Sequence, residues 1–316
     1  MNDFKAEPLE LREAMLKAAN RVLESGWYVL GNECKQFEEQ WSTVCGVGHG
    51  IGVANGMDAI EIALLGLSIG GGDEVITTPM TAFATILAII RSGAKPVLAD
   101  IDSETALLSI ESVRRSLTAN TKAVILVHLY GQVRQMDEWV NFCEENKIML
   151  IEDCAQAHQA TWEGKVAGSF GQAGAYSFYP TKNLGAVGDA GMLVTNNSTL
   201  AEKARQLRNY GQSERYLHPV VGMNSRLDEI QAVMLSERMK WLPEFTKCRR
   251  QIADTYHAKI DNPLVKHLIK PEQKSAHVYH LFVITCPQRD ALQAHLLKKG
   301  VQALIHYPVT VQQQKP

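Results

Sequence analysis

The sequence of 316 residues has few closely spaced cysteines and little excess of charge of either sign. Its six cysteines lie far apart, and none forms a Cys-x-x-Cys pair. Zinc sites and small disulfide-stabilised folds both need closer spacing, so we expect neither. The formal net charge is only -2, which gives no long-range attraction for nucleic acid or an anionic membrane. Any anionic ligand must therefore bind at a local site.

Long hydrophobic runs are also missing. The most apolar stretch, around residues 82–90, is too short to cross a bilayer. Residues 1–7 lack the apolar segment of a secretory signal. With 46% hydrophobic and 21% charged residues, the composition is that of an ordinary globular protein. We therefore expect a soluble, cytoplasmic protein without membrane partners.

Seven short segments have the apolar, β-branched composition of strands buried in a parallel sheet. They are residues 50–54, 74–78, 96–100, 122–128, 147–153, 173–178 and 190–195. Helical spacing separates most of them, as in residues 58–67, 110–117 and 136–146. This alternation predicts an α/β fold with a mainly parallel seven-stranded sheet.

The two ends of the chain have a different pattern. Helical spacing precedes the first strand and returns after residue 198, in residues 8–25, 33–42, 199–208, 227–241 and 245–260. Two further predicted strands, residues 278–286 and 301–305, flank a predicted helix over residues 289–299. We predict a large domain over residues 1–243 and a smaller C-terminal α+β domain over residues 244–316. Since the small domain has so few elements, we expect it to be incomplete.

The first predicted strand is followed by Asn55, Gly56, Met57 and Asp58, which open a helix. Backbone N–H groups at a helix N-terminus, together with the helix dipole, bind anions. The alternative interpretation is an ordinary helix cap formed by Asn55 or Asp58.

Two carboxylates, Glu152 and Asp153, come directly after the apolar residues of the fifth predicted strand. Burying them costs free energy unless a cation or a donor compensates. A metal pair and a general acid or base are both open interpretations. The alternative is that one carboxylate caps the next helix and the other is solvated.

Lys182 follows the sixth predicted strand, in a loop rich in glycine. A lone lysine in a loop is usually just exposed to solvent. However, ligands of open α/β sheets bind at the carboxyl ends of the strands, so Gly56, Asp153 and Lys182 should meet at one edge. An anion site, a carboxylate and a lysine together suit pyridoxal 5'-phosphate (PLP), whose pyridine nitrogen must stay protonated.

Several segments resemble the sugar aminotransferases of the DegT/DnrJ/EryC1/StrS family, which have the type I aspartate-aminotransferase fold. The resemblance extends over nearly the whole chain and is carried by residues 25–31, 128–131, 151–158, 177–184, 207–211, 224–232 and 306–308. It departs from the family pattern at the end of the chain, which stops soon after His306-Tyr307-Pro308.

The resemblance implies which residues hold the cofactor ring. Lys182 would be the Schiff-base lysine and would also relay the proton between cofactor and substrate. Asp153 would pair with the pyridine nitrogen, and Gln156 would contact the 3-hydroxyl of the ring. Phe83 would stack on the ring, since a flat ring needs an apolar face against it. The alternative for Phe83 is a core position in an apolar helix.

The resemblance also implies a phosphate site shared between subunits. Gly56 and Met57 would donate backbone N–H groups to the phosphate, and Ser177 its hydroxyl. Asn224 would reach the phosphate of the neighbouring subunit, which makes a homodimer obligatory. The alternative for Asn224 is the N-cap of the helix that follows it.

For the reaction, the resemblance implies transfer of an amino group from glutamate, through pyridoxamine phosphate, to a nucleotide-linked keto-sugar. Residues 55–60 favour C3 of a dTDP-3-keto-6-deoxyhexose. His158, His306 and Tyr307 are placed near the sugar, or else support it as outer hydrogen-bonding residues. Two alternatives are a PLP-dependent sugar dehydratase, against which the retained Lys182 counts, and a non-catalytic regulatory protein that binds PLP or the sugar.

Overall fold

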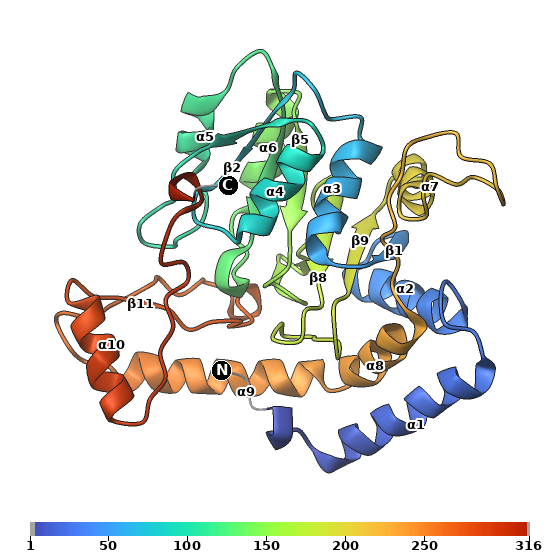
Figure 1. The fold of residues 1–316 in the computed structure, drawn as a ribbon. Helices are drawn as coiled ribbons and strands as arrows, with labels where there is room; N and C mark the ends of the chain where they lie inside the picture. The colour runs from blue at the N-terminus through green and yellow to red at the C-terminus, as the bar shows by residue number, and fades with distance from the viewer. Residues whose placement is uncertain (1–3, 315–316) are drawn as a thin grey trace.

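The computed structural model describes residues 4–314. At its centre lies a seven-stranded sheet with the strand order β1-β9-β8-β5-β4-β2-β3 (Figure 1). Its strands are β1 (His49–Val53), β2 (Glu74–Thr77), β3 (Lys95–Leu98), β4 (Thr121–Val127), β5 (Met149–Asp153), β8 (Ala173–Ser177) and β9 (Gly191–Thr195). Neighbours from β3 to β8 are parallel, and β9 is antiparallel to both β8 and β1. The predicted α/β fold with a mainly parallel seven-stranded sheet is confirmed.

Helices cover both faces of this sheet. One face packs against α3 (Gly56–Gly66), α4 (Phe83–Arg91) and α7 (Ser198–Leu207). The other packs against α2 (Asn32–Cys45), α5 (Ile110–Ser116), α6 (Met136–Glu145) and α8 (Glu229–Met239). Outside this layer, α1 (Leu9–Ser25) packs on α8. We call these the α3/α4 face and the α2/α6 face.

The two faces explain why the strands are mainly apolar. In β5, Leu150 lies in the core of the α2/α6 face, whereas Ile151 lies in the core of the α3/α4 face. Successive side chains of a strand point to opposite sides, and here both sides are covered by helices. The strands therefore lack the alternation of apolar and polar residues that is typical of a sheet with one exposed face.

The remaining short elements connect or flank the sheet. They are η1 (Phe4–Ala6), η2 (Leu129–Gly131), β6 (Thr161–Trp162), β7 (Lys165–Val166), η3 (Lys274–Ala276) and η4 (Val311–Gln313). Within residues 4–314, no helix is long and apolar enough to span a bilayer.

The C-terminal part consists of α9 (Leu242–Lys259), the strand pair β10 (Lys266–His267) and β11 (Ile284–Thr285), and α10 (Arg289–Lys298). In Figure 1, α10 and β11 lie near the end of α9 that points away from α8. The boundary between residues 243 and 244 stays a prediction.

Two predicted strands of this part are wrong in extent or existence. Of residues 278–286, only Ile284–Thr285 forms a strand, because Val278 instead donates its N–H to the carbonyl of Gly131 at 2.9 Å. Residues 301–305 form no strand. Their alternating apolar pattern suits a strand, but a strand also needs a neighbour to pair with, and the described residues provide none.

Candidate active site

The carboxyl ends of β1, β5 and β8 meet at one edge of the sheet, as predicted for the residues that follow them. Asp153, the last residue of β5, pairs in register with Ala175 of β8. Gly56 lies against Ser177 at the end of β8, because a Cβ on Gly56 would stand 2.6 Å from the Ser177 Cβ. Only glycine allows the N-terminus of α3 to approach β8 so closely.

The N-terminus of α3 combines a cap with unused donors. Asn55 is the N-cap, and its side chain accepts the backbone N–H of Asp58 at 2.9 Å. The cap interpretation of Asn55 is therefore confirmed. The N–H groups of Gly56 and Met57 belong to the first turn, where no acceptor exists inside the helix. The cap is thus compatible with an anion site at the same helix end.

Glu152 and Asp153 point to opposite faces of the sheet, so they cannot bind one metal ion together. Glu152 is fully buried on the α2/α6 face. Its Oε1 accepts the N–H groups of Phe170 and Gly171, at 2.8 and 2.9 Å. Its Oε2 accepts the Gly168 N–H at 2.7 Å and contacts the Nε2 of His128 at 2.9 Å. The metal-pair interpretation of the two carboxylates is wrong.

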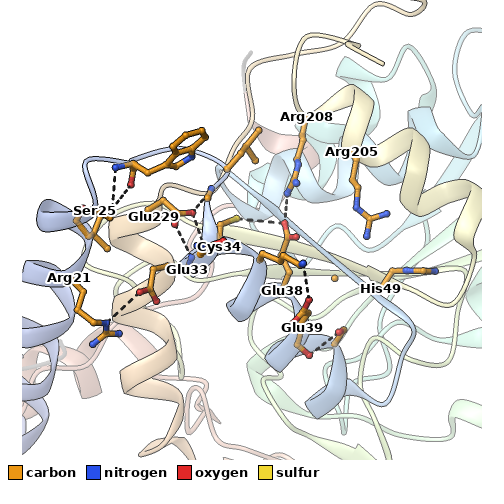
Figure 2. Close-up of a pocket in the computed structure, with 18 of the residues that line it drawn as sticks. Arg21, Ser25, Glu33, Cys34, Glu38, Glu39, His49, Arg205, Arg208 and Glu229 are labelled. Atoms are coloured by element: carbon orange, nitrogen blue, oxygen red, sulfur yellow. Dashed lines mark hydrogen bonds and ion pairs between the residues drawn. The ribbon is translucent and has the colours of Figure 1, made fainter. Parts of the chain in front are cut away.

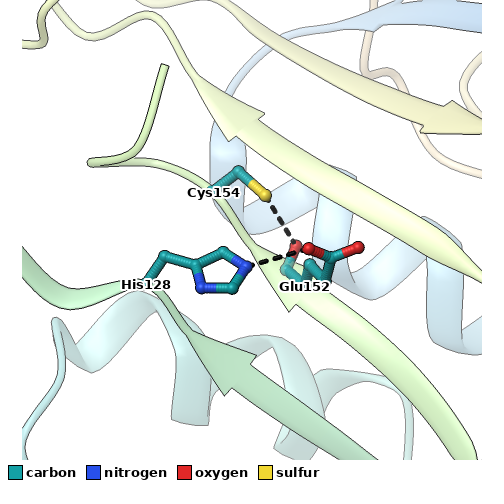
Figure 3. Close-up of side chains that lie close together, drawn as sticks. All are labelled: His128, Glu152 and Cys154. Carbon is teal, nitrogen blue, oxygen red and sulfur yellow. Dashed lines mark hydrogen bonds and ion pairs between the residues drawn. The ribbon is translucent and has the colours of Figure 1, made fainter. Parts of the chain in front are cut away.

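His128, Glu152 and Cys154 form a compact cluster of ligand-type side chains (Figure 3). Each oxygen of Glu152 already has two hydrogen-bonding partners, which uses the accepting capacity of a carboxylate. Burial raises the pKa of the Cys154 thiol well above its ordinary value, so the thiolate form that binds metals is disfavoured. The cluster therefore holds the loop around residues 168–171 to β5.

Asp153 has a different environment on the α3/α4 face. Its Oδ2 accepts the hydroxyl of Thr85 at 2.9 Å, and its Oδ1 accepts the N–H of Ala155 at 3.1 Å. Two bonds use only half of the accepting capacity of a carboxylate. Asp153 can therefore accept another strong donor from a ligand.

Lys182 lies in the loop between β8 and β9 and is partly buried. Burial lowers the pKa of its amine below the ordinary value, and the charge of Asp153 opposes this shift. A larger fraction of the Lys182 amine is therefore neutral than in a surface lysine at the same pH. The next residue anchors the loop, since Asn183 donates to the carbonyl of Val278 at 3.1 Å and contacts Nδ1 of His280 at 3.0 Å.

His158 is buried beneath this loop and hydrogen-bonds to it. It is fully buried, its ring packs against Trp41 and Phe178, and its Nδ1 accepts the N–H of Leu184 at 2.9 Å. Burial, reinforced by the charge of Lys182, lowers the pKa of His158 to about 3. This burial and the bond to Leu184 fit the outer hydrogen-bonding interpretation of His158, and its place relative to the sugar stays a prediction.

Gln156 connects the sheet edge to the end of the chain. Its Oε1 accepts the N–H of Tyr130 at 2.6 Å, and its Nε2 lies 3.4 Å from the hydroxyl of Tyr307. The Tyr130 hydroxyl donates to the carbonyl of His306 at 2.7 Å. Burial and the charge of Asp153 raise the pKa of Tyr307 to about 12. The segment around His306 and Tyr307 is therefore close to Gln156 and Asp153.

Two predicted site residues lie at the margin of this arrangement. Phe83 is the first residue of α4, and it is partly buried against the core of the α3/α4 face. Both of its interpretations stay open. Asn224 is exposed and bridges to Asn209. The N-cap interpretation of Asn224 is wrong, because α8 begins at Glu229 and its N-cap is Asp228.

A cavity of about 820 Å³ lies elsewhere, between α1, α2, β1 and the end of α7 (Figure 2). Its lining contains none of the predicted site residues. Arg208 there binds Glu38, and Glu38 accepts the N–H of Gly52 in β1 at 2.7 Å. The Arg208–Glu38 pair thus ties α2 to the sheet.

The model of the DegT/DnrJ/EryC1/StrS aminotransferase family matches residues 9–316. The chain belongs to this family. A dTDP-3-amino-3,6-dideoxy-alpha-D-galactopyranose transaminase of Aneurinibacillus thermoaerophilus is 44% identical over 99% of this chain and 86% of its own length. A protein of Geobacillus stearothermophilus named pleiotropic regulatory protein is 41% identical over 98% of this chain and 84% of its own. The crystal structure of Streptomyces venezuelae DesV, in complex with a ketimine intermediate, is similar with a TM-score of 0.95 and 39% identity, covering 99% of this chain and 84% of that one.

This family member is an aminotransferase whose cofactor is PLP. The described residues fit that cofactor. The close approach of Gly56 to Ser177 leaves an anion cradle at a helix N-terminus, and Lys182 is a lysine whose neutral form is favoured by burial. Asp153 is a buried carboxylate with accepting capacity to spare.

Two residues without a predicted role, Thr85 and Tyr130, contact predicted site residues. Thr85 lies two residues after Phe83 and contacts Asp153, and Tyr130 binds Gln156 through its backbone. A signal for Thr85 exists in the sequence, because it is a hydroxyl in an apolar helix with Thr81 four residues before it.

Proposed function

We propose that this aminotransferase moves the amino group of L-glutamate to C3 of a dTDP-linked 3-keto-6-deoxyhexose. The observation that carries the proposal is the sheet edge itself, where a lysine of lowered pKa lies near Asp153 and where Gly56 contacts Ser177. The choice of C3 is supported by the 44% identical relative, whose name gives a sugar with its amino group at C3.

Bound PLP would supply an electron sink and carry the amino group between the two substrates. Lys182 would hold the cofactor covalently, and its neutral amine would relay the proton between cofactor and substrate. Asp153 keeps the ring nitrogen protonated through its unused accepting capacity. Gln156 would present its amide N–H group to the 3-hydroxyl of the ring, since its oxygen already accepts the N–H of Tyr130.

The phosphate of the cofactor binds at the N-terminus of α3. Gly56 and Met57 donate their first-turn N–H groups, and Ser177 donates its hydroxyl from the end of β8. Phe83, the first residue of α4, would stack on the ring. These four residues come from three different elements, so the site forms only when the sheet has assembled.

We infer that the enzyme is a homodimer in which the partner subunit's Asn224 completes the phosphate site. Asn224 belongs to a loop with strongly exposed apolar side chains, among them Tyr216, 81% exposed, and Val221, 94% exposed. Tyr28, whose carbonyl accepts the N–H of Glu229 at 3.1 Å, is exposed as well. Apolar surface of this kind supports a protein interface.

The first experiment tests cofactor and donor together. Purified protein is mixed with PLP, and its visible absorption spectrum is measured before and after glutamate. We expect a band that glutamate bleaches, stoichiometric 2-oxoglutarate, and no band in Lys182→Ala. Absence of the band in the unaltered protein would refute the lysine assignment, and a band without 2-oxoglutarate would favour the dehydratase or the regulatory alternative.

The second experiment tests the acceptor. The protein charged with glutamate is offered dTDP-linked 3-keto-6-deoxyhexoses and 4-keto-6-deoxyhexoses in separate reactions. NMR of the product places the new C–N bond at C3 or at C4. Amination of the 4-keto sugars alone would overturn the C3 assignment and leave the transaminase assignment standing.

The third experiment tests the shared site. Lys182→Ala and Asn224→Asp subunits are each expected to have little activity by themselves. In randomly mixed dimers, about one quarter of the sites combine an intact lysine with an intact asparagine, so about that fraction of activity should return. No recovery, with exchange of subunits verified, would rule out a site shared through Asn224.

A further inference from the structure

We propose that Thr85, held by Thr81, is a positioning residue that orients the Asp153 carboxylate toward the ring nitrogen of the cofactor. The inference rests on the proposed function of Asp153. It extends that function to Thr85 in α4 and to Thr81, which precedes α4. Thr85 would act only through Asp153 and would not touch the cofactor or the substrate.

The direction of the hydrogen bonds follows from the number of protons available. The Thr85 hydroxyl lies 2.9 Å from Oδ2 of Asp153 and 2.8 Å from the hydroxyl of Thr81. An ionised carboxylate only accepts, so the single proton of Thr85 is donated to Asp153. Thr81 must then donate its own proton to Thr85. The chain of donors runs from Thr81 through Thr85 to Asp153.

Burial makes these hydrogen bonds hard to replace. Thr85 is 1% exposed and Thr81 is 3% exposed, so water does not compete for either hydroxyl. Thr85 is also β-branched and lies in a helix, which restricts the rotation of its side chain. The Thr85 hydroxyl is therefore a rigid donor at one oxygen of Asp153.

The second oxygen of Asp153 is held independently. Its Oδ1 accepts the N–H of Ala155, only two residues further along the chain. Within residues 4–314, Thr85 is therefore the one hydrogen-bond donor that ties the carboxylate to a different element of the fold. Without that bond, the carboxylate can rotate and its ionised form loses a stabilising donor. The proton shared with the ring nitrogen would then move toward the carboxylate.

The test compares four variants of the PLP-bound protein with the unaltered protein. Thr85→Val removes the hydroxyl and keeps the shape, Thr85→Ser keeps the hydroxyl, and Thr81→Val removes the donor behind it. The matched control is Thr77→Val, because Thr77 is also fully buried but donates to the carbonyl of Ile125 at 2.9 Å, in β4. Two quantities are measured: the ¹⁵N chemical shift of the ring nitrogen of labelled cofactor, and kcat with KM for glutamate.

We expect a graded result. Thr85→Val should move the ¹⁵N shift toward the unprotonated value and lower kcat about tenfold, which is the effect of losing one hydrogen bond to a charged group. KM should change little, because Thr85 does not touch the substrate. Thr81→Val should give a smaller change of the same sign. Thr85→Ser and Thr77→Val should keep the unaltered shift.

The outcomes separate this inference from the proposed function. If the unaltered protein shows no protonated ring nitrogen, the assignment of Asp153 fails. If it does, and Thr85→Val keeps both the shift and kcat, the positioning role is refuted. Should Thr85→Val not fold, Thr81→Val and Thr85→Ser decide the matter. An unchanged shift in Thr81→Val together with a displaced shift in Thr85→Ser would overturn the proposal.

Discussion

Glu152 and Asp153 are neighbours in sequence, yet the two faces of the sheet give them opposite properties. On the α2/α6 face, Glu152 is fully buried and all of its accepting capacity is used by backbone N–H groups and His128. On the α3/α4 face, Asp153 accepts one hydroxyl and one N–H. The saturated carboxylate serves the fold, and the unsaturated one is left with capacity for a ligand.

The difference shows how to separate structural from functional acids in this molecule. A buried charge costs free energy unless it is compensated, and Glu152 is compensated entirely within the chain. The burial of Asp153 is compensated only in part, because its carboxylate accepts two hydrogen bonds. This is expected for a group that completes its hydrogen bonds with a bound molecule. Substitutions on the two faces should therefore affect different measured quantities.

The largest effect is expected on the Asp153 side, from Lys182→Ala. Activity should fall by about four orders of magnitude, as when a nucleophile that forms a covalent intermediate is removed. The free energy of unfolding of the apoprotein should change little, because Lys182 lies in a loop. Glutamate-dependent formation of 2-oxoglutarate and urea unfolding measure the two quantities. Retention of more than a small fraction of activity would contradict the assignment.

Asp153→Asn should come next, with kcat reduced by about a hundredfold to a thousandfold, the range found when one preorganised electrostatic partner is lost. The amide oxygen can still accept the Thr85 hydroxyl, so the apoprotein should unfold at nearly the same urea concentration. Steady-state kinetics and urea unfolding test both statements. A large loss of stability with normal kcat would show that Asp153 is structural like Glu152.

Glu152→Gln should have the reverse profile. A glutamine side chain has one accepting oxygen, whereas N–H groups of residues 168–171 bind both oxygens of Glu152. In the variant, a buried N–H group would therefore lose its partner. We expect the free energy of unfolding to fall by about 3 kcal/mol, with kcat per folded molecule nearly unchanged. Urea unfolding and active-site titration measure these. A variant that is fully stable but inactive would break the comparison between the two faces.

A smaller effect is expected from Gly56→Ala, with Gly71→Ala as its control. A Cβ at position 56 meets the Ser177 Cβ at 2.6 Å, whereas a Cβ at position 71 meets nothing within 4 Å. Displacement of α3 from β8 should weaken PLP binding about tenfold, comparable to the loss of one charged hydrogen bond. Cofactor titration by absorbance measures this. Equal affinities in the two variants would exclude the phosphate site at Gly56.

The smallest effect concerns pH. Because the pKa of Lys182 is lowered by burial, its amine becomes neutral at a lower pH than an exposed lysine. The rate of covalent PLP attachment should rise with pH, with a midpoint below about 10.4, the ordinary lysine value. Asp153 raises this pKa, so Asp153→Asn should move the midpoint to still lower pH. Stopped-flow absorbance measures the rate, and a shift to higher pH would disprove the coupling.

Much of the sheet could be predicted from the sequence because its strands are local signals. Each is a short apolar run buried on both sides, and such runs are recognisable without knowledge of their neighbours. Residues 301–305 show the limit of this approach, since their pattern suits a strand but no pairing partner exists in the described part of the chain. The formation of a strand depends on a second segment that pairs with it as much as on its own sequence.

Gly56, Asp153 and Lys182 could be predicted from the sequence because each lies at or just beyond the carboxyl end of a predicted strand, and the carboxyl ends of parallel strands share one edge. Thr85 and Tyr130 received no role, because each acts through a contact with a residue distant in sequence. Asn224 precedes a helix and reads as its cap, yet α8 begins only at Glu229.

The sequence by itself determined the fold class, the family and the residue types available at the sheet edge, because these depend on short patterns along the chain. The tertiary structure alone decided which of two adjacent carboxylates is saturated. That difference depends on the loop of residues 168–171 on one face and on Thr85 on the other. In any strand, adjacent side chains point to opposite faces of the sheet. The packing of distant segments decides which groups each of these side chains contacts.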